Sequence, residues 1–278
     1  QRITTVCPAT TAAVVTTLAT GASPAEHAIL GWHLNLPDLG MVGTLLPFVT
    51  RTDTPIAPPG FDLEQYLALP APLATISGRR VLISEGNIPT SRTSMAQPWW
   101  TERRSFKSLD GMLRQLCIFA RSRGRATAYA YWPRYDSYCH KHGPEGRVPA
   151  RHLVEIDKFL SRLERALAGT NTLLLVTADH GHMQTRTRID LSAISGFYDT
   201  LATLPSGDSR MVQCFVRPSR VQEFLRLTRR LPLRGAAACV SMSEVLRSGI
   251  LGPGRPHSAL NNRLGDYVLF AGSGTAFL

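Results

Sequence analysis

The stretch that decides the fold is Asn171-Thr-Leu-Leu-Leu-Val-Thr-Ala178, which is followed at once by Asp179-His180-Gly181-His182. Its apolar residues are consecutive rather than alternating, which is typical of a strand buried on both faces of a parallel sheet. In such sheets, ligands bind beyond the carboxyl ends of the strands. The stretch therefore predicts a buried strand over residues 171–178 that delivers an ionisable pair to a functional edge.

Helices and strands alternate along the rest of the chain. Helical spacing and capping residues predict helices over 12–20, 62–69, 109–121, 148–168 and 220–230. β-branched and aromatic runs predict strands over 81–84, 126–132, 211–216 and 267–271, with a Pro- and Gly-rich loop over 36–60. This alternation predicts an α/β fold, a three-layer α/β/α sandwich with a mainly parallel central sheet.

Length and composition further narrow the class of protein to which the chain can belong. The 278 residues are 44% hydrophobic and 18% charged, which excludes a disordered chain and allows one large domain. No apolar run approaches the roughly 20 residues that span a bilayer, and no signal peptide is visible. Five widely spaced cysteines without a CxxC motif predict buried thiols in a reducing, cytoplasmic setting.

The chain is strongly basic, with a formal net charge of +11. Of its 31 basic residues three are lysines, so 28 are arginines. This charge suits either a solvated basic surface or an anionic substrate. The arginines are scattered and not interleaved with aromatic residues, so no stable nucleic-acid complex is expected. Pro98-Trp99-Trp100 and Phe106 could stack on a base, but a place in the core is the better interpretation.

Aspartate and histidine recur near three predicted strand ends. The pair Asp179 and His180 follows the strand over 171–178, and Asp136 and His140 follow the strand over 126–132. His257 precedes the last strand. Carboxylate oxygen and imidazole nitrogen suit zinc in a hydrolytic site. One helical turn would bring Asp136 and His140 to the same face, as two ligands of one metal should be.

A nucleophile is also available, because the predicted helix over 12–20 begins beside Thr10 and Thr11. A hydroxyl there meets free backbone N–H groups and the positive end of the helix dipole, which favour a phosphate. A plain threonine N-cap is the alternative interpretation.

Four segments that contain these residues resemble motifs of one known superfamily. Thr10-Thr11-Ala12 through Thr20-Gly21 and Pro24-Ala25-Glu26-His27 resembles the S-T-T-A…T-G…P-x-E-H-G segment of the alkaline phosphatase superfamily. Asp136 to Pro144 resembles its D-x-x-x-H-x-x-G-P motif, and Thr177 to Gly181 its T-A-D-H-G motif. His257 with Arg263-Leu264-Gly265-Asp266 resembles H…R-x-G-D. The most similar branch is that of the nucleotide pyrophosphatase/phosphodiesterase-like proteins, and the similarity runs through the whole chain.

The resemblance implies an alkaline phosphatase-like fold and a hydrolase of phosphodiester or pyrophosphate bonds in small anionic substrates such as nucleotides. Thr11 would be the nucleophile and would form a covalent intermediate. Two zinc ions would take part, one held by Asp136, His140 and His257, the other by Asp179 and His180. His142 and His182 would lie outside the ligand set, and His27 would pack at a helix end. Asp266 and Arg210 would be structural.

Three departures from the family pattern shape the expectations. The family's first metal-binding Asp, in a V-D-G context, has no counterpart after Gln1, so we expect an N-terminally incomplete domain and a second zinc site short of one ligand. Ala28 replaces a glycine. Asn35, in the segment Gly31-Trp32-His33-Leu34-Asn35, is a candidate for the asparagine that helps to hold the phosphoryl group.

The expected organisation is a single catalytic domain over 1–278, lacking its first strand, with a substrate-side insert or cap over 33–108. Three alternatives stay open: a phosphomonoesterase or phosphomutase on the same scaffold, a catalytically impaired chain that only binds ligands or proteins, and a basic nucleic-acid binder. A sulfatase is disfavoured because Cys7 lies off the nucleophile position.

Overall fold

The computed structural model describes residues 3–230 and 232–278, so Gln1 and Arg2, with which the sequence opens, lie outside the described residues. The chain divides into two compact units. The first unit comprises Gln1–Pro70 and Asp179–Leu278, and the second comprises Ala71–Ala178. The division falls at Pro70, inside the range predicted as an insert over 33–108, and the extent of that insert stays a prediction.

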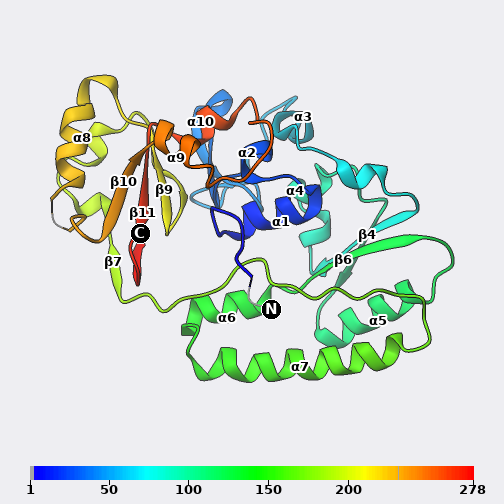
Figure 1. The fold of residues 1–278 in the computed structure, drawn as a ribbon. Helices are drawn as coiled ribbons and strands as arrows, with labels where there is room; N and C mark the ends of the chain where they lie inside the picture. Colours follow the sequence, from blue (N-terminus) through cyan, green and yellow to red (C-terminus); the bar gives the residue numbers. More distant parts are fainter. Residues whose placement is uncertain (1–2, 231) are drawn as a thin grey trace. The chain divides into compact units, whose positions relative to one another are not determined.

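The first unit is built on a seven-stranded antiparallel sheet (Figure 1). In spatial order its strands are β10 (Ala237–Ser241), β11 (Tyr267–Ala271), β9 (Met211–Cys214), β8 (Ser206–Asp208), β1 (His33–Leu36), β2 (Met41–Thr44) and β3 (Val49–Thr50). A separate parallel pair joins β7 (Thr187–Ile189) to β12 (Thr275–Phe277). The helices of this unit are α1 (Thr11–Thr20), α2 (Pro24–His27), α3 (Leu63–Leu67), α8 (Val221–Thr228), α9 (Met242–Ser248) and α10 (Leu260–Leu264).

Helices cover both faces of the β9–β11 part of this sheet, as Figure 1 shows for α8 and α9. On one face, Phe224 of α8 packs against Val212 and Leu269. On the other face, Val245 of α9 and Leu264 of α10 pack against strand residues. The sheet alternates its side chains between two apolar layers, which explains why these strands read as nearly continuous apolar runs.

Phe224 gives the first testable prediction, because its side chain is 0% exposed. Replacing it with alanine removes a large apolar side chain and leaves a cavity, so Phe224→Ala should lower the free energy of unfolding by about 3–5 kcal/mol. Leu204 of the same unit is 48% exposed. Leu204→Ala should therefore change the free energy of unfolding by less than about 0.5 kcal/mol. Denaturant titration measures both, and similar losses in the two variants would contradict the assigned core.

The second unit is a small α/β layer. Strand β4 (Arg79–Glu85) lies between β5 (Glu102–Phe106) and β6 (Ala126–Tyr131), and all three are parallel. Its helices are α4 (Arg92–Met95), α5 (Leu109–Ala120), α6 (Arg134–His142) and α7 (Arg147–Leu167). Helices α5 and α7 pack side by side on this sheet (Figure 1), and their apolar stripes bury Met112, Phe159 and Leu163 against Val81 and Ile83.

Most predicted elements are confirmed within a few residues. The helix predicted over 62–69 is α3, and Asp62 caps it, since its carboxylate accepts the Gln65 N–H at 3.1 Å. The core interpretation of the tryptophans is confirmed, because Trp99 and Trp100 are buried together with Phe106. All five cysteines are free thiols. The predicted loop over 36–60 is wrong in part, because it contains β2 and β3.

The prediction for residues 171–178 is wrong. These residues form no strand, and Leu173 and Leu175 are 83% and 81% exposed. An apolar run favours burial, but a strand also needs a neighbour for its backbone hydrogen bonds. Within the described residues, β6 pairs only with β4, so no strand of the sheet reaches this segment. The expected mainly parallel sheet is likewise limited to three strands, because the largest sheet is built from antiparallel neighbours.

Among the described residues, no helix combines the length and the apolarity that crossing a bilayer requires.

Candidate active site

Helix α1 places Thr11 at its first position. Thr10 has an extended backbone and precedes the helix, while Gly21 ends it in the left-handed region at φ 68° and donates to the Thr17 carbonyl. The small residues Ala12 and Ala13 are buried, which lets the start of the helix pack closely into the unit. The predicted helix boundaries and the position of Thr11 at the N-terminus are confirmed, so its hydroxyl lies beside free backbone N–H groups.

Thr11 contacts the residues that follow position 178. Its Oγ1 lies 3.0 Å from His180 Nε2, in hydrogen-bond distance. Asp179 Oδ2 lies 3.6 Å from the same Nε2 atom. The segment is held here by Thr5, whose hydroxyl donates to the Asp179 carbonyl at 2.6 Å. The first unit thus brings together Thr11, Asp179 and His180, three of the residues that the sequence selected.

The hydrogen bonds of His180 fix its tautomer. Its Nδ1 lies 3.1 Å from the Gly181 carbonyl, which can only accept, so Nδ1 carries the proton. The Nε2 lone pair then points toward Thr11 Oγ1 and toward the carboxylate of Asp179. Asp179 Oδ2 is buried and accepts no hydrogen bond from the described residues. With Nδ1 protonated, the Thr11 hydroxyl donates to Nε2, so Asp179 Oδ2 is the acceptor that lacks a donor, and a buried carboxylate oxygen of this kind favours a cation. The residues therefore fit a metal ion, and a nitrogen–carboxylate–hydroxyl set suits zinc.

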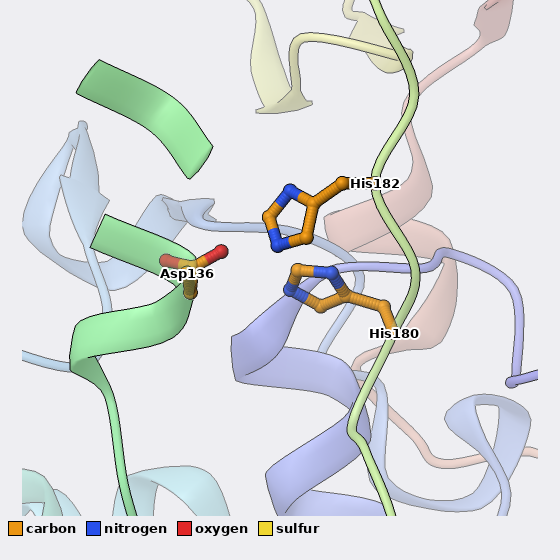
Figure 2. A group of neighbouring side chains, drawn as sticks. All are labelled: Asp136, His180 and His182. Carbon is orange, nitrogen blue, oxygen red and sulfur yellow. The ribbon is translucent and has the colours of Figure 1, made fainter. Parts of the chain in front are cut away.

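His182 belongs to this group, although the sequence interpretation left it outside the ligand set. Its ring lies 5.3 Å from the ring of His180, measured between centroids, and their ligand nitrogens lie within 4.8 Å of each other. Figure 2 shows both rings projecting from the same side of the extended segment. The spacing of two residues was the available signal, because side chains at i and i+2 share a face when the backbone is extended.

The second unit holds Asp136, the third residue labelled in Figure 2, and His140. Both lie on α6, and His140 Nε2 lies 3.3 Å from Asp136 Oδ1. The prediction that one helical turn places the two side chains together is confirmed. The side chain of Asp136 is 27% exposed and that of His140 is 74% exposed, while the Oδ1 atom of Asp136 itself is buried.

His257 and Asn35 are engaged elsewhere in the first unit. The His257 Nδ1 atom accepts the Ala259 N–H at 3.1 Å, and the ring donates to the backbone of Ala68. Among the described residues, His257 joins no cluster of three closely spaced metal-ligating atoms. Asn35 Nδ2 donates to the Asn262 carbonyl at 2.9 Å and ties β1 to α10. The structure thus gives both residues a scaffolding contact.

His27 is a packing residue, as the sequence interpretation expected. It is fully buried at the end of α2, where Nε2 contacts Thr17 Oγ1 at 3.0 Å and Nδ1 accepts the Ile29 N–H. Burial lowers the pKa of His27 to about 3, with smaller contributions from His257 and Arg263. Its neutral form is therefore part of the folded structure.

This pKa gives a prediction for acid stability. An unfolded histidine has a pKa near ~6.5, so between pH ~6 and ~4 the unfolded chain takes up a proton at His27 and the folded chain does not. The contribution of His27 is therefore complete above pH ~6.5 and is lost as the pH falls toward the folded value, by up to about 1.4 kcal/mol per pH unit. Denaturant titration against pH should give a flatter slope for His27→Gln than for the wild type, whereas the exposed control His142→Gln should keep the slope. Equal slopes in all three proteins would refute this assignment.

Comparisons with known proteins bear on what this site does. The profile of the family described as Type I phosphodiesterase / nucleotide pyrophosphatase matches residues 75–278. No curated protein sequence matches significantly. The structure of murine ectonucleotide pyrophosphatase / phosphodiesterase 5 superposes with a TM-score of 0.74 at 18% identity, over 100% of this chain and 71% of that one. Phosphonoacetate hydrolase from Sinorhizobium meliloti 1021, in complex with phosphonoformate, superposes with a TM-score of 0.64 at 15% identity, over 99% and 72%.

The fold and the family match place the chain in the alkaline phosphatase superfamily, and the predicted alkaline phosphatase-like α/β class is confirmed. It is a phosphoryl hydrolase of the nucleotide pyrophosphatase/phosphodiesterase type. More narrowly, the chain belongs to the Type I phosphodiesterase / nucleotide pyrophosphatase family.

Proposed function

We propose that the protein hydrolyses phosphodiester or pyrophosphate bonds of small anionic substrates through a covalent intermediate on Thr11. The observation that carries the proposal is the contact of Thr11 Oγ1 with His180 Nε2 at 3.0 Å, at the N-terminus of α1 and beside the buried Asp179 carboxylate. A nucleophile, an anion-binding helix end and a cation-binding pair are thereby within one group of side chains.

The metal donors of this proposal are those that the family resemblance implies. Asp179 and His180, with Thr11, would hold one zinc ion, and His182 adds a neighbouring nitrogen. Asp136 and His140 would hold a second zinc ion, with His257 as the remaining ligand that the family resemblance implies. When bound, such ions neutralise phosphoryl charge and favour the deprotonated form of a hydroxyl. The proposal requires His257 to exchange its contacts with Ala259 and Ala68 for the metal.

The residues of the chain then perform two in-line displacements. Thr11 Oγ forms a bond to phosphorus while the bond to the leaving-group oxygen breaks, and the threonine proton passes to solvent. Water next forms a bond to phosphorus, the bond to Thr11 Oγ breaks, and the threonine regains a proton from that water. Backbone N–H groups at the start of α1 hold the phosphoryl oxygens during both steps.

The expected substrates are nucleotides and related small phosphodiesters. An inactive threonine-to-alanine variant of murine ectonucleotide pyrophosphatase / phosphodiesterase 5 is described in complex with AMP, with a TM-score of 0.72 to this chain. That complex supports a nucleotide substrate and a threonine nucleophile here. The net charge of +11 favours encounter with anionic substrates.

The test compares a bis-aryl phosphodiester with the aryl monoester that has the same leaving group. Protein freed of metal by a chelator should be inactive, and zinc should restore hydrolysis of the diester at a higher kcat/KM than that of the monoester. A faster monoester reaction would favour the phosphomonoesterase alternative. No zinc-dependent hydrolysis of either ester would contradict the proposal and favour a chain that only binds ligands.

A further inference from the structure

The second unit has an open pocket at the amino ends of β4 and β6. Its volume of about 430 Å³ is typical of sites that hold small molecules. Strand β6 is six residues long, so its carboxyl end, which leads into α6, lies about 20 Å further along the sheet. The pocket is therefore distinct from the pair of Asp136 and His140 on α6. The residues that line it are Thr75, Ile76, Ser77, Arg125, Ala126 and Thr127.

The two segments that form the walls of this pocket are fixed to each other through the backbone. Gly78 has a φ of 99°, and a Cβ atom there would lie 2.1 Å from the Arg125 carbonyl oxygen, so only glycine allows this close approach. The Arg79 N–H donates to the same carbonyl at 3.1 Å. The Arg80 guanidinium donates to the carbonyls of Ile76 and Gly78 at 2.7 and 3.2 Å. Because the chain itself holds the walls in place, little ordering free energy is lost when a ligand binds.

The surroundings of the pocket are strongly basic. The second unit contains 17 lysines and arginines and 8 acidic residues, so it carries +9 of the formal net charge of +11. The segments 75–80 and 121–127 contain five arginines and no acidic residue. Arg79 is paired with Glu102 at 3.6 Å. The Arg125 side chain, by contrast, forms no hydrogen bond or ion pair with the residues that the structure describes. An exposed guanidinium in a positive field attracts anions.

The side chains of the lining residues suit a phosphate group. The planar fork of an arginine matches two oxygens of a phosphate, and the hydroxyl groups of Thr75, Ser77 and Thr127 are further donors. None of the lining residues is acidic, so no charge of the lining repels an anion. We infer that this pocket binds a small phosphorylated molecule, with the phosphate on Arg125 and the organic part in the remaining volume beside Ile76.

The test titrates the full chain with glycerol 3-phosphate and follows the backbone amide signals by NMR, with a chelator present to prevent turnover. The amide signals of residues 75–78 and 125–127 should shift and saturate. Glycerol, which lacks only the phosphate, should leave them in place. Shifts that do not saturate, or equal shifts with glycerol, would overturn the inference. No turnover is measured, so the outcome is independent of the proposed hydrolase activity.

Arg125→Gln should weaken the affinity for glycerol 3-phosphate by about tenfold or more, because it removes the charged donor. Arg151→Gln is the matched control, since Arg151 is exposed on α7 of the same unit and does not line the pocket. It removes the same charge and should change the affinity by less than about twofold, because solvent and salt screen a distant charge. Equal affinities in the wild type and Arg125→Gln would count against the site.

A second pair of variants tests the pocket without changing Arg125. Ser77 is exposed, so both replacements should fold. Ser77→Asp places a carboxylate among the lining residues and should abolish the saturable shifts by repulsion, whereas the neutral Ser77→Asn should keep them. Binding of glycerol 3-phosphate to Ser77→Asp with wild-type affinity would refute the assignment of this pocket.

Discussion

Replacing Thr11 with alanine is expected to lower kcat/KM for an aryl phosphodiester by about 10³-fold or more, because the proposed pathway has no other nucleophile. Thr11→Ser should retain measurable turnover, since it keeps the hydroxyl at the first position of α1. Steady-state kinetics of the zinc-loaded proteins measures both values.

The matched control is Thr10→Ala, which makes the same chemical change one residue earlier. The Thr10 side chain makes no capping hydrogen bond. The kcat/KM of Thr10→Ala should therefore stay within about a few-fold of the wild-type value. Zinc content measured on each variant separates loss of the nucleophile from loss of the metal. If Thr11→Ala kept wild-type turnover, the assignment of the nucleophile would be wrong.

His180→Ala is expected to have the second large effect, on metal binding and activity together. The Nε2 atom of His180 is the point toward which Thr11 and Asp179 converge. Its loss should weaken zinc binding by more than about 100-fold and reduce diesterase activity to background. Asp179→Asn should act in the same direction, because it removes the buried negative charge that attracts the cation.

His142→Ala serves as the control for these variants, because His142 is exposed at the end of α6 and is assigned no ligand role. It should bind zinc with wild-type affinity. Competition with a chromophoric chelator gives the affinities without reference to turnover. Unchanged zinc affinity in His180→Ala would exclude this histidine from the metal site.

The sequence was informative where a residue's role depends on local structure. The first position of α1 could be predicted from its threonines and from the glycine that ends the helix. The pairing of Asp136 with His140 could be predicted because residues four apart lie one helical turn from each other. His180 could be selected because it follows the most apolar stretch of the chain, and the structure brings it to Thr11, 169 positions away in the sequence.

The sequence was less informative where a role depends on long-range neighbours. Residues 171–178 have the composition of a buried strand, but the described sheets provide no partner and the segment is exposed. The short strands of the antiparallel sheet have little periodicity of their own and exist through pairing. Arg263 is unremarkable in the sequence, because its burial does not follow from the residues beside it.

The most direct test of the central claim is mass spectrometry of the protein after rapid acid quench during turnover of a phosphodiester. The account predicts that the peptide containing Thr11 carries the transferred phosphoryl group, and that Thr11→Ala yields no modified peptide. Turnover without modification of Thr11, or with the group on another residue, would contradict it.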